Sequence, residues 1–266
     1  MSADLEAELD GELDVATDGA TAGRALRGLA GVGVFLAAWA VAARFSPAYV
    51  LPGPLVTGET FLTEVRSGRA VDALASSVRH WWRGTLVGTV LGVGLGVALG
   101  WSDLAEDGAA PLVRLLRPVP PLALTGFAIA WFGINHTGAA FVVAGGALWI
   151  NYYAAYGGVQ SVPDDLLDVA RSLGVRSDVG LIRKVVLPSA SSEILTGIRT
   201  GVGRCWMLII AAETIGVAGV GNRILTAASN LAVDVVIAYI VVMSLVYLVL
   251  DTAFQAVQRR LLRWRA

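Results

Sequence analysis

Apolar runs of membrane-spanning length recur along the chain and predict transmembrane helices. About 20 mostly apolar residues are needed to cross the hydrocarbon core of a bilayer. Six segments approach this length, at residues 26–45, 84–101, 118–135, 137–159, 194–217 and 235–257. The third segment begins at a proline, and the fifth and sixth contain charged residues. The pattern predicts an all-α membrane protein with six transmembrane helices.

The stretch between the first two predicted spans, residues 47–80, is too polar to cross the membrane. Its larger apolar residues recur at helical spacing, at Leu55, Phe61, Leu62, Val65, Val71, Leu74 and Val78. Two arrangements fit this pattern. One is a set of short amphipathic helices that lie on the external membrane surface, and the other is a cap packed over the helix bundle.

Glycines repeat every fourth residue along the second predicted span, at Gly84, Gly88, Gly92, Gly96 and Gly100. This spacing puts the glycines on one face of a helix, where a second backbone can approach closely. The sequence leaves open whether that second helix comes from the same subunit or from another one.

The distribution of basic residues predicts the orientation of the chain, because cytoplasmic segments are enriched in Arg and Lys. With both termini inside, the cytoplasmic set is Arg24, Arg27, Arg114, Arg117, Arg171, Arg176, Arg183, Lys184, Arg259, Arg260, Arg263 and Arg265. The external set is then Arg44, Arg66, Arg69, Arg79, Arg83 and Arg223. The first set is twice as large, so we expect both termini in the cytoplasm.

The composition agrees with a membrane protein, since 56% of the residues are hydrophobic and 15% are charged, whereas soluble domains carry about a quarter charged residues. Seven acidic residues and no base occur among the first eighteen residues. We expect a disordered, acidic cytoplasmic tail at residues 1–25, with a docking role as the alternative. A transmembrane domain at residues 26–258 and a basic cytoplasmic tail at residues 259–266 would follow.

A polar segment with helical patterning, residues 162–188, separates the fourth and fifth predicted spans. Pro163 and the two aspartates after it suit the first turn of a helix, and Gly174 suits its end. Ser177 can cap a second helix that stops just before Pro188. The segment therefore predicts two short helices joined by a turn on the cytoplasmic side.

Leu166, Ala170 and Leu173 share one face of the first of these short helices. An exposed apolar ridge at this place would suit a docking element for another protein. A loop that folds back on its own helix bundle is the other interpretation, and the pattern does not decide between the two.

Several motifs resemble those of ABC importer permeases. The residues "DVARSLGV" and "VVLP" are similar to the cytoplasmic loop signature of that family, which reads E-A-A, three residues, G, nine residues, I-x-L-P. Four further stretches resemble permeases that import sulfonates, taurine, nitrate or bicarbonate. They are "YVLPGPLV", "RPVPPLAL…WFGI", "GIRTGVGRCW…AAETIG" and "GVGNRIL", and the resemblance covers roughly residues 49–263.

The chain departs from the loop signature in three respects. Asp168 stands where the signature has Glu, and Val169 stands where it has Ala. Ten residues, 175–184, separate Gly174 from "VVLP", where the signature has nine. The extra residue leaves the register of the second short helix open.

The resemblance implies a MetI-like permease core whose cytoplasmic two-helix coupling loop lies between the fourth and fifth spans. It implies a non-catalytic, multi-pass subunit of the inner membrane that pairs with a second permease, as a homodimer or as one of two paired permeases. The other implied partners are a cytoplasmic ABC ATPase and an external substrate-binding protein. No cofactor and no nucleic acid are expected. The residues expected to couple to the ATPase are Leu166, Asp168, Ala170, Leu173 and Gly174.

The residues themselves also require a separate source of energy. A phosphate-cradling loop reads G-x-x-x-x-G-K-[ST], and the only lysine of this chain, Lys184, follows Arg183. The chain therefore cannot bind ATP in that way. The single cysteine, Cys205, lies in an apolar run, so we expect a buried thiol and no disulfide or thiolate metal site.

Charged residues inside the fifth predicted span are candidates for the substrate path. Arg204 and Glu213 are costly in lipid and need a partner or a wet cavity. Nine residues separate them, which is about 13 Å along a helix and places them on opposite faces. The candidate path residues are Arg204, Trp206, Asn151 and Glu213. Structural roles are the alternative, with Arg204 bonded to carbonyl groups of the broken helix after Pro118.

Three classes of function compete at this point. An ATP-driven importer subunit for a small anionic solute fits the motifs. An ion-driven secondary transporter or channel is the alternative, although that class often shows an internal repeat and none is visible. An intramembrane enzyme would need a cluster of catalytic side chains. His80 and His136 are both expected near the external interface, with His136 at a turn, and predict no such cluster.

Overall fold

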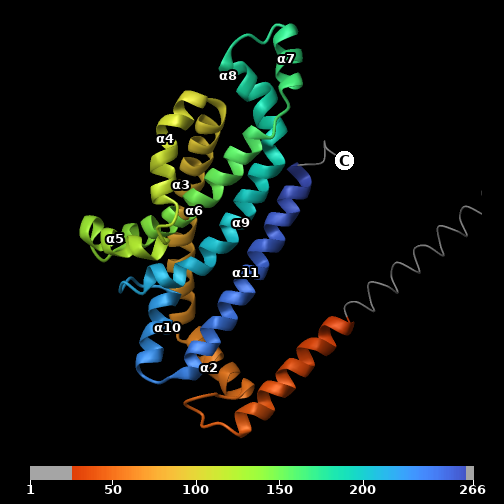
Figure 1. The fold of residues 1–266 in the computed structure, drawn as a ribbon. Helices are drawn as coiled ribbons and strands as arrows, with labels where there is room; N and C mark the ends of the chain where they lie inside the picture. Colours follow the sequence, from red (N-terminus) through yellow and green to blue (C-terminus); the bar gives the residue numbers. More distant parts are fainter. Residues whose placement is uncertain (1–25, 262–266) are drawn as a thin grey trace, which may run out of the picture.

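The structure is a computed structural model that describes residues 26–261. All regular elements in this range are helices (Figure 1). They are Leu26–Arg44, α2 (Pro54–Arg66), α3 (Arg69–Trp101), α4 (Asp103–Leu116), η1 (Pro121–Ala123), α5 (Leu124–Phe132), α6 (His136–Gln160), α7 (Asp164–Ser172), α8 (Asp178–Leu181), the π-helical turn η2 (Ile182–Val186), α9 (Leu187–Glu213), α10 (Val220–Ser229) and α11 (Val233–Leu261). The acidic tail predicted at residues 1–25 and the last five residues of the basic tail lie outside the described range.

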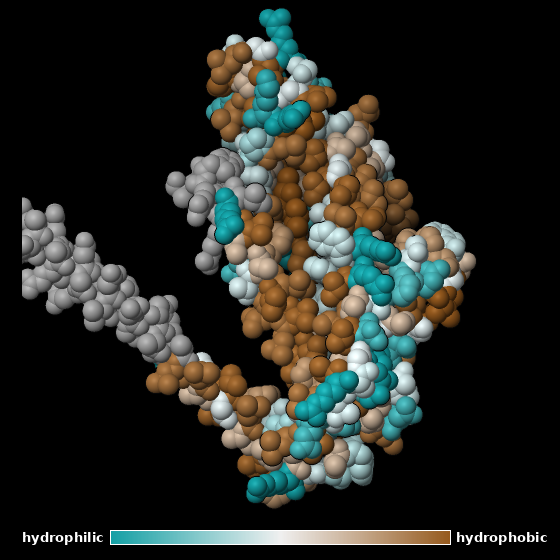
Figure 2. All heavy atoms as spheres, turned by 180° about the vertical axis from the view of Figure 1, so that it is seen from behind, coloured by the Kyte–Doolittle hydropathy of each residue, from teal (hydrophilic) through white to brown (hydrophobic). Residues whose placement is uncertain are grey.

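The chain passes repeatedly between two ends of the molecule (Figure 1). One end carries α2 and α10, and the opposite end carries α7 and α8. Helices α3, α6 and α11 run toward the α7–α8 end, and α9 runs back from it. Hydrophobic residues cover much of the middle of the face in Figure 2, and hydrophilic residues gather at both ends. This distribution suits a bundle whose middle lies in lipid.

Five described helices are long and apolar enough to cross a membrane, and the number rises to six if α4 and the η1–α5 segment form one broken span. The two parts of that pair are bent by 80°. The third span predicted at residues 118–135 therefore corresponds to the η1–α5 part of this bent pair, which α4 precedes. Proline lacks the backbone N–H that a helix interior needs, and α5 begins only at Leu124, after Pro118, Pro120 and Pro121. Its nine residues give a length of about 14 Å.

The second span is much longer than the run at residues 84–101 predicts, because α3 starts at Arg69 and contains 33 residues. Such a helix is about 50 Å long. Residues 69–80 of the polar stretch therefore form the first third of α3. Only α2 is a separate helix in the stretch, and it packs against α3 and α11. This packing agrees with the cap interpretation and not with helices spread on the membrane surface.

A buried carboxylate holds this cap together. Glu64 of α2 is 4% exposed and accepts hydrogen bonds from the Arg223 guanidinium at 2.8 Å, the Tyr239 hydroxyl at 2.8 Å and Nε of Arg69 at 2.9 Å. These partners lie on α10, α11 and α3. One acidic side chain thus joins four helices at the α2 end of the molecule.

The glycine stripe of α3 packs against α6 of the same chain. A Cβ atom added at Gly88 would lie 2.3 Å from the carbonyl oxygen of Ala144, and one added at Gly92 would lie 2.4 Å from that of Leu148. Gly84 and Gly96 meet the α6 backbone in the same way. The structure thereby answers the question that the sequence left open. The glycines let two long helices of one subunit touch backbone to backbone.

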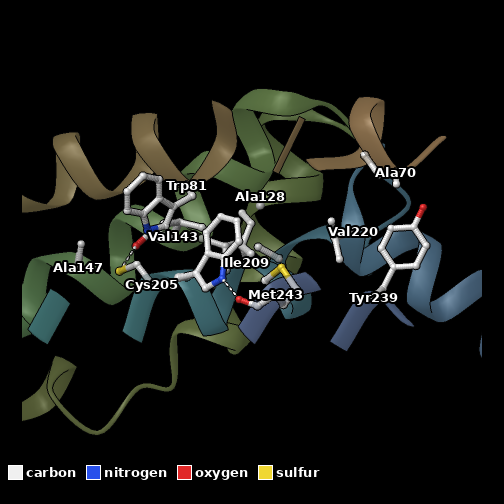
Figure 3. Packing of buried hydrophobic residues seen from close by; sticks show 14 residues of the cluster. Ala70, Trp81, Ala128, Val143, Ala147, Cys205, Ile209, Val220, Tyr239 and Met243 are labelled. Atoms are coloured by element: carbon white, nitrogen blue, oxygen red, sulfur yellow. Dashed lines mark hydrogen bonds between the residues drawn. The ribbon is translucent and has the colours of Figure 1, made fainter. Parts of the chain in front are cut away.

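The apolar core lies where α3, α6, α9 and α11 meet (Figure 3). Trp81 and Trp206 pack edge to face with ring centroids 5.8 Å apart. The indole N–H of Trp206 donates to the carbonyl of Met243 at 2.9 Å, so the ring carries no unpaired polar group. Cys205 is fully buried with its Sγ near the carbonyl of Val143, which confirms the expected buried thiol.

Candidate functional site

The predicted first helix of the polar loop is α7, and its ends are set by local sequence. Pro163 precedes the first turn, where Asp164 and Asp165 favour the positive end of the helix dipole. At the other end, Gly174 has φ +94°. Its N–H bonds to the carbonyl of Arg171, and the N–H of Val175 bonds to that of Ala170, each at 3.0 Å. This pair of bonds is a Schellman motif, which needs the left-handed conformation that glycine adopts freely.

The two faces of α7 differ from the prediction at one position. Ala170 is buried at 8% exposure, on the side of α7 that packs against α8 and η2. It therefore lies under the helix and not in the middle of an exposed ridge. The exposed apolar side chains are Leu166, Val169 and Leu173, and Leu173 is 80% exposed. The loop folds back on itself through Ala170 and also leaves an apolar face outside.

Asp168 is exposed on α7 and makes a local ion pair. Its carboxylate lies 2.9 Å from the guanidinium of Arg171, one turn later. Both side chains are more than half exposed, so the pair is screened by water and contributes little to stability. The Asp168 carboxylate is thus available at the surface of the loop.

The second short helix begins as predicted but does not stop before Pro188. The Ser177 hydroxyl accepts a hydrogen bond from the N–H of Gly180 at 3.2 Å, which confirms the N-cap. The four residues of α8 then continue through the π-helical turn into α9, and Pro188 lies in the first turn of α9. Proline is tolerated in a first turn, where its missing N–H costs little. The stop predicted before Pro188 is therefore wrong.

The π-helical turn at Ile182–Val186 lies inside the interval that is one residue longer than the loop signature. A π turn holds one residue more than an α turn between its bonded groups, and single π turns commonly occur at functional sites. The extra residue is thus accommodated within a continuous helix. Beyond the turn, α9 packs against α6.

Three of the four candidate path residues are buried inside the subunit. Trp206 is 1% exposed, and Asn151 and Glu213 are fully buried. The Asn151 amide donates to the carbonyl of Ala147 and to the hydroxyl of Thr89, at 2.8 and 3.1 Å. Each of the three side chains is bonded to other groups of the bundle, which suits the structural roles that the sequence leaves as the alternative.

Arg204 is different, because its side chain is exposed on α9. It makes no hydrogen bond or ion pair within the described residues, and the predicted bonds to carbonyls after Pro118 do not form. Four further residues on the same helix face as Arg204 are also exposed, namely Glu193, Thr196, Thr200 and Met207. At 100° per residue these positions fall within one side of the helix. We call these five residues the α9 stripe.

Two open cavities lie along the α9 stripe. The first has a volume of about 420 Å³ and is bordered by Ile150 and Ala154 of α6 together with Glu193, Thr196 and Thr200. The second has a volume of about 340 Å³ and is lined by Thr196, Arg199, Thr200, Gly203, Arg204, Met207, Tyr247 and Asp251. Polar groups on the outer side of a membrane helix are costly in lipid. The α9 stripe is therefore a candidate path surface.

A buried polar chain lies near the α2–α10 end of the bundle and was not predicted from the sequence. Glu213 accepts from the Ser77 hydroxyl at 2.9 Å and from the Gly221 N–H at 2.8 Å, and it lies 2.8 Å from Nδ1 of His80. Nε2 of His80 in turn lies 2.6 Å from Nδ1 of His136. The signal in the sequence was the pair of glycines around Val220. A Cβ at Gly219 would lie 2.2 Å from the Glu213 carboxyl carbon, so the backbone wraps this side chain closely.

Comparison with known proteins identifies the family. Residues 88–263 match the family described as the binding-protein-dependent transport system inner membrane component. The chain belongs to this family. Its members are non-catalytic permease subunits of ABC importers, in which ATP is hydrolysed by a separate chain and the solute is delivered by a binding protein. The protein is thus a multi-pass inner-membrane permease that binds no cofactor of its own.

Two relatives and one solved structure illustrate the likeness. The permease is 33% identical over 243 residues to SsuC of Bacillus subtilis, whose name describes an aliphatic sulfonates transport permease protein, and the match covers 90% of this chain and 88% of that protein. It is 38% identical over 155 residues to the taurine transport system permease protein TauC of Escherichia coli, covering 58% and 56%. A chain of the inward-facing MetNI methionine ABC transporter has a similar fold, with a TM-score of 0.65 at 16% identity, over 74% of this chain and 98% of that chain.

Proposed function

We propose that this permease, as a homodimer, forms the membrane path of an ATP-driven importer for small anions of the sulfonate class. Two observations support the substrate class. The relatives SsuC and TauC are named for aliphatic sulfonates and taurine, and the exposed side of α9 carries an arginine without a partner among residues 26–261.

The second copy is needed to cover the α9 stripe. The Arg204 guanidinium would be costly if it faced hydrocarbon, whereas the same group facing a partner subunit borders a polar path. A twofold interface repeats each residue on both sides. A homodimer therefore encloses the two cavities on α9 between like surfaces and keeps them away from lipid.

The exposed apolar face of α7 is the observation that carries the coupling proposal. Leu166, Val169 and Leu173 are all exposed on the helix at the far end of the bundle (Figure 1). We expect this face to dock in the ATPase, with the Asp168 carboxylate at its edge, Gly174 fixing the end of the helix and Ala170 holding the helix against the rest of the loop.

Motion can pass from this contact into the membrane along one helix. The helical segment from Asp178 to Glu213 is 36 residues long and continuous, and α7 packs against its first turns through α8 and η2. Closure of the ATPase would tilt α7 together with α9 as a rigid body. The α9 stripe would then move with the docking face.

The proposed orientation puts the α7–α8 end in the cytoplasm, together with both termini and the tails at residues 1–25 and 259–266. The α2–α10 end then faces the binding protein. A Ser177→Cys variant should react with an impermeant thiol reagent only from the cytoplasmic side, and Ser67→Cys only from outside. Reaction of Ser177→Cys from outside in intact cells contradicts this orientation.

The coupling proposal is tested by Leu173→Asp in the full permease. Because Leu173 is 80% exposed, the change removes little packing inside the chain, but it brings a carboxylate into an apolar contact with the ATPase. The permease should reach the membrane at normal yield, lose the ATPase on purification and stop uptake. The control is Leu55→Asp on α2, where an 83% exposed leucine lies at the opposite end. Retention of the ATPase by Leu173→Asp rules out docking through this face.

A further inference from the structure

We infer that Arg204, together with the Tyr247 hydroxyl, forms a binding subsite for the oxyanion group of the solute within the permease itself. The inference rests on the proposed path along the α9 stripe and adds the residues that recognise charge there. The cavity that both residues line has a volume of about 340 Å³, which lies within the range of small-molecule sites.

The charges around this cavity leave one cation uncompensated. Arg199 is paired with Asp251 through two hydrogen bonds, at 3.0 and 3.2 Å. The amide of Gln255 also donates to the same carboxylate at 2.7 Å, which holds Asp251 toward Arg199. Arg204 has no such partner in the described part of the chain. The cavity therefore presents the positive charge of Arg204 alone.

The hydrogen-bond donors that remain available in the cavity also suit an anionic ligand. The hydroxyl protons of Thr196 and Thr200 are already donated to helix carbonyls, at 2.7 and 2.9 Å. The Tyr247 hydroxyl has no partner among residues 26–261, and so two donor groups, a guanidinium and a phenol, remain for a ligand. A planar guanidinium can donate two parallel bonds to a sulfonate or carboxylate.

The backbone of α9 is adapted to the position of Tyr247. A Cβ added at Gly203 would lie 2.9 Å from Cε2 of the Tyr247 ring and 3.4 Å from its hydroxyl. A side chain at residue 203 would displace the ring from α9. The glycine before Arg204 thus lets the Tyr247 ring lie against α9, on the border of the cavity that Arg204 also lines.

The depth of Arg204 separates this subsite from a lipid headgroup site. Arg204 lies nine residues before the external end of α9 at Glu213, which is about 13 Å along the helix axis. A homodimer also brings a second Arg204 into the same path. Two unpaired guanidinium groups repel each other, and a bound anion relieves this repulsion.

The test uses the complete permease with its ATPase in proteoliposomes and a cysteine placed in the cavity. Met207 is 63% exposed and lines the same cavity, so Met207→Cys reports what reaches Arg204. Labelling rates are measured with the anionic sulfonatoethyl and the cationic trimethylammonioethyl methanethiosulfonates. Their ratio is normalised to the ratio at an exposed control, Ser67→Cys. The parent chain gives the background, since its single cysteine is buried.

We expect the anionic reagent to be favoured at Met207→Cys, with a normalised ratio about tenfold above that of the Arg204→Gln/Met207→Cys variant, because a fixed charge in a cleft concentrates counter-ions. Arg204→Lys should restore most of the preference, and Tyr247→Phe should leave it intact. Added methanesulfonate should slow labelling beside Arg204, and do so less in both Arg204→Gln and Tyr247→Phe.

The outcomes separate this inference from the proposed function. Equal normalised ratios with and without Arg204, or no protection by methanesulfonate, overturn the subsite and leave the path intact. Failure of both reagents to reach Met207→Cys overturns the path along α9 as well. ATPase release by Leu173→Asp is independent of either result and continues to test the coupling proposal.

Discussion

His80 and Glu213 form a fully buried pair, in which Nδ1 of the imidazole lies 2.8 Å from a carboxylate oxygen. They are 133 residues apart in the sequence and belong to α3 and α9. The same carboxylate accepts bonds from Ser77 and from the backbone of α10, and the far side of the imidazole reaches His136 at the start of α6. One acidic group therefore joins four helices near the α2–α10 end of the bundle.

Replacement of Glu213 by alanine should destabilise the permease strongly. Three buried donors, from Ser77, His80 and Gly221, would lose their acceptor, and each buried group left unpaired costs about 1–3 kcal/mol. Thermal unfolding of the purified protein in detergent should show a clear loss of stability. Glu59→Ala, at an exposed glutamate of α2, is the matched control and should unfold as the parent does. Equal unfolding of the two variants would show that the buried chain contributes nothing.

The α3–α6 contact should tolerate no side chain at Gly88. A Cβ at this position would lie 2.3 Å from the carbonyl oxygen of Ala144, so Gly88→Ala must push two backbones apart, at a cost of about 1–3 kcal/mol. Gly94→Ala is the control on the same helix, since nothing lies within 4 Å of the added atom. That change should be neutral or slightly stabilising, because alanine favours helix more than glycine does. The comparison is made by unfolding in detergent, and similar losses in both variants contradict the contact.

The Glu64 cluster should make stability depend on pH in the acid range. Burial alone would raise the pKa of Glu64, but hydrogen bonds from Arg69, Tyr239 and Arg223 outweigh it and hold the pKa below its ordinary value of 4.5. A carboxyl whose pKa is lowered by folding stabilises the protein above its unfolded pKa, and this stabilisation is lost as the pH falls through the lower folded value.

The parent should therefore lose thermal stability as the pH is lowered from about 5 toward 3, where such a carboxyl takes up its proton. Glu64→Gln should be less stable at neutral pH and should lose less on acidification. Glu59→Gln, at an exposed position of the same helix, serves as the control and should keep the acid dependence of the parent. An unchanged acid profile in Glu64→Gln would assign that dependence to other groups.

Local chemistry accounts for the features that the sequence predicted well. Apolar length predicted the helices at α6, α9 and α11, because the requirement for about 20 apolar residues acts within one segment. The start of α7 after Pro163, its end at Gly174 and the Ser177 cap were likewise predictable, since caps and turns depend on neighbouring residues. The permease motifs predicted the family for a similar reason, because each motif consists of residues that are neighbours in the sequence.

The errors arose where a residue's environment is made by distant parts of the chain. Pro118, Pro120 and Pro121 indicated a break, but they did not give the 80° angle between the two parts of the bent pair. Helical spacing alone placed Ala170 on an exposed face of α7. Spacing determines which residues share a face, but it does not determine which elements pack against that face. In the structure α8 and η2 cover Ala170, and Leu166 and Leu173 remain outside.

The sequence by itself determined that this chain spans a membrane, where α7 begins and ends, and that ATP is hydrolysed by a separate chain. Hydrophobic length, helix caps and motifs are properties of neighbouring residues, so they can be recognised without the fold. Only the tertiary structure decided that the glycine stripe of α3 meets α6, that Glu213 is bonded to His80, and that Arg204 alone among the four candidate path residues is exposed. Burial and pairing are made by contacts between residues tens to more than a hundred positions apart. Spacing along one helix carries no information about such partners. The charge and polarity of these residues made them candidates in the sequence, but only the packing showed which of them are buried and bonded.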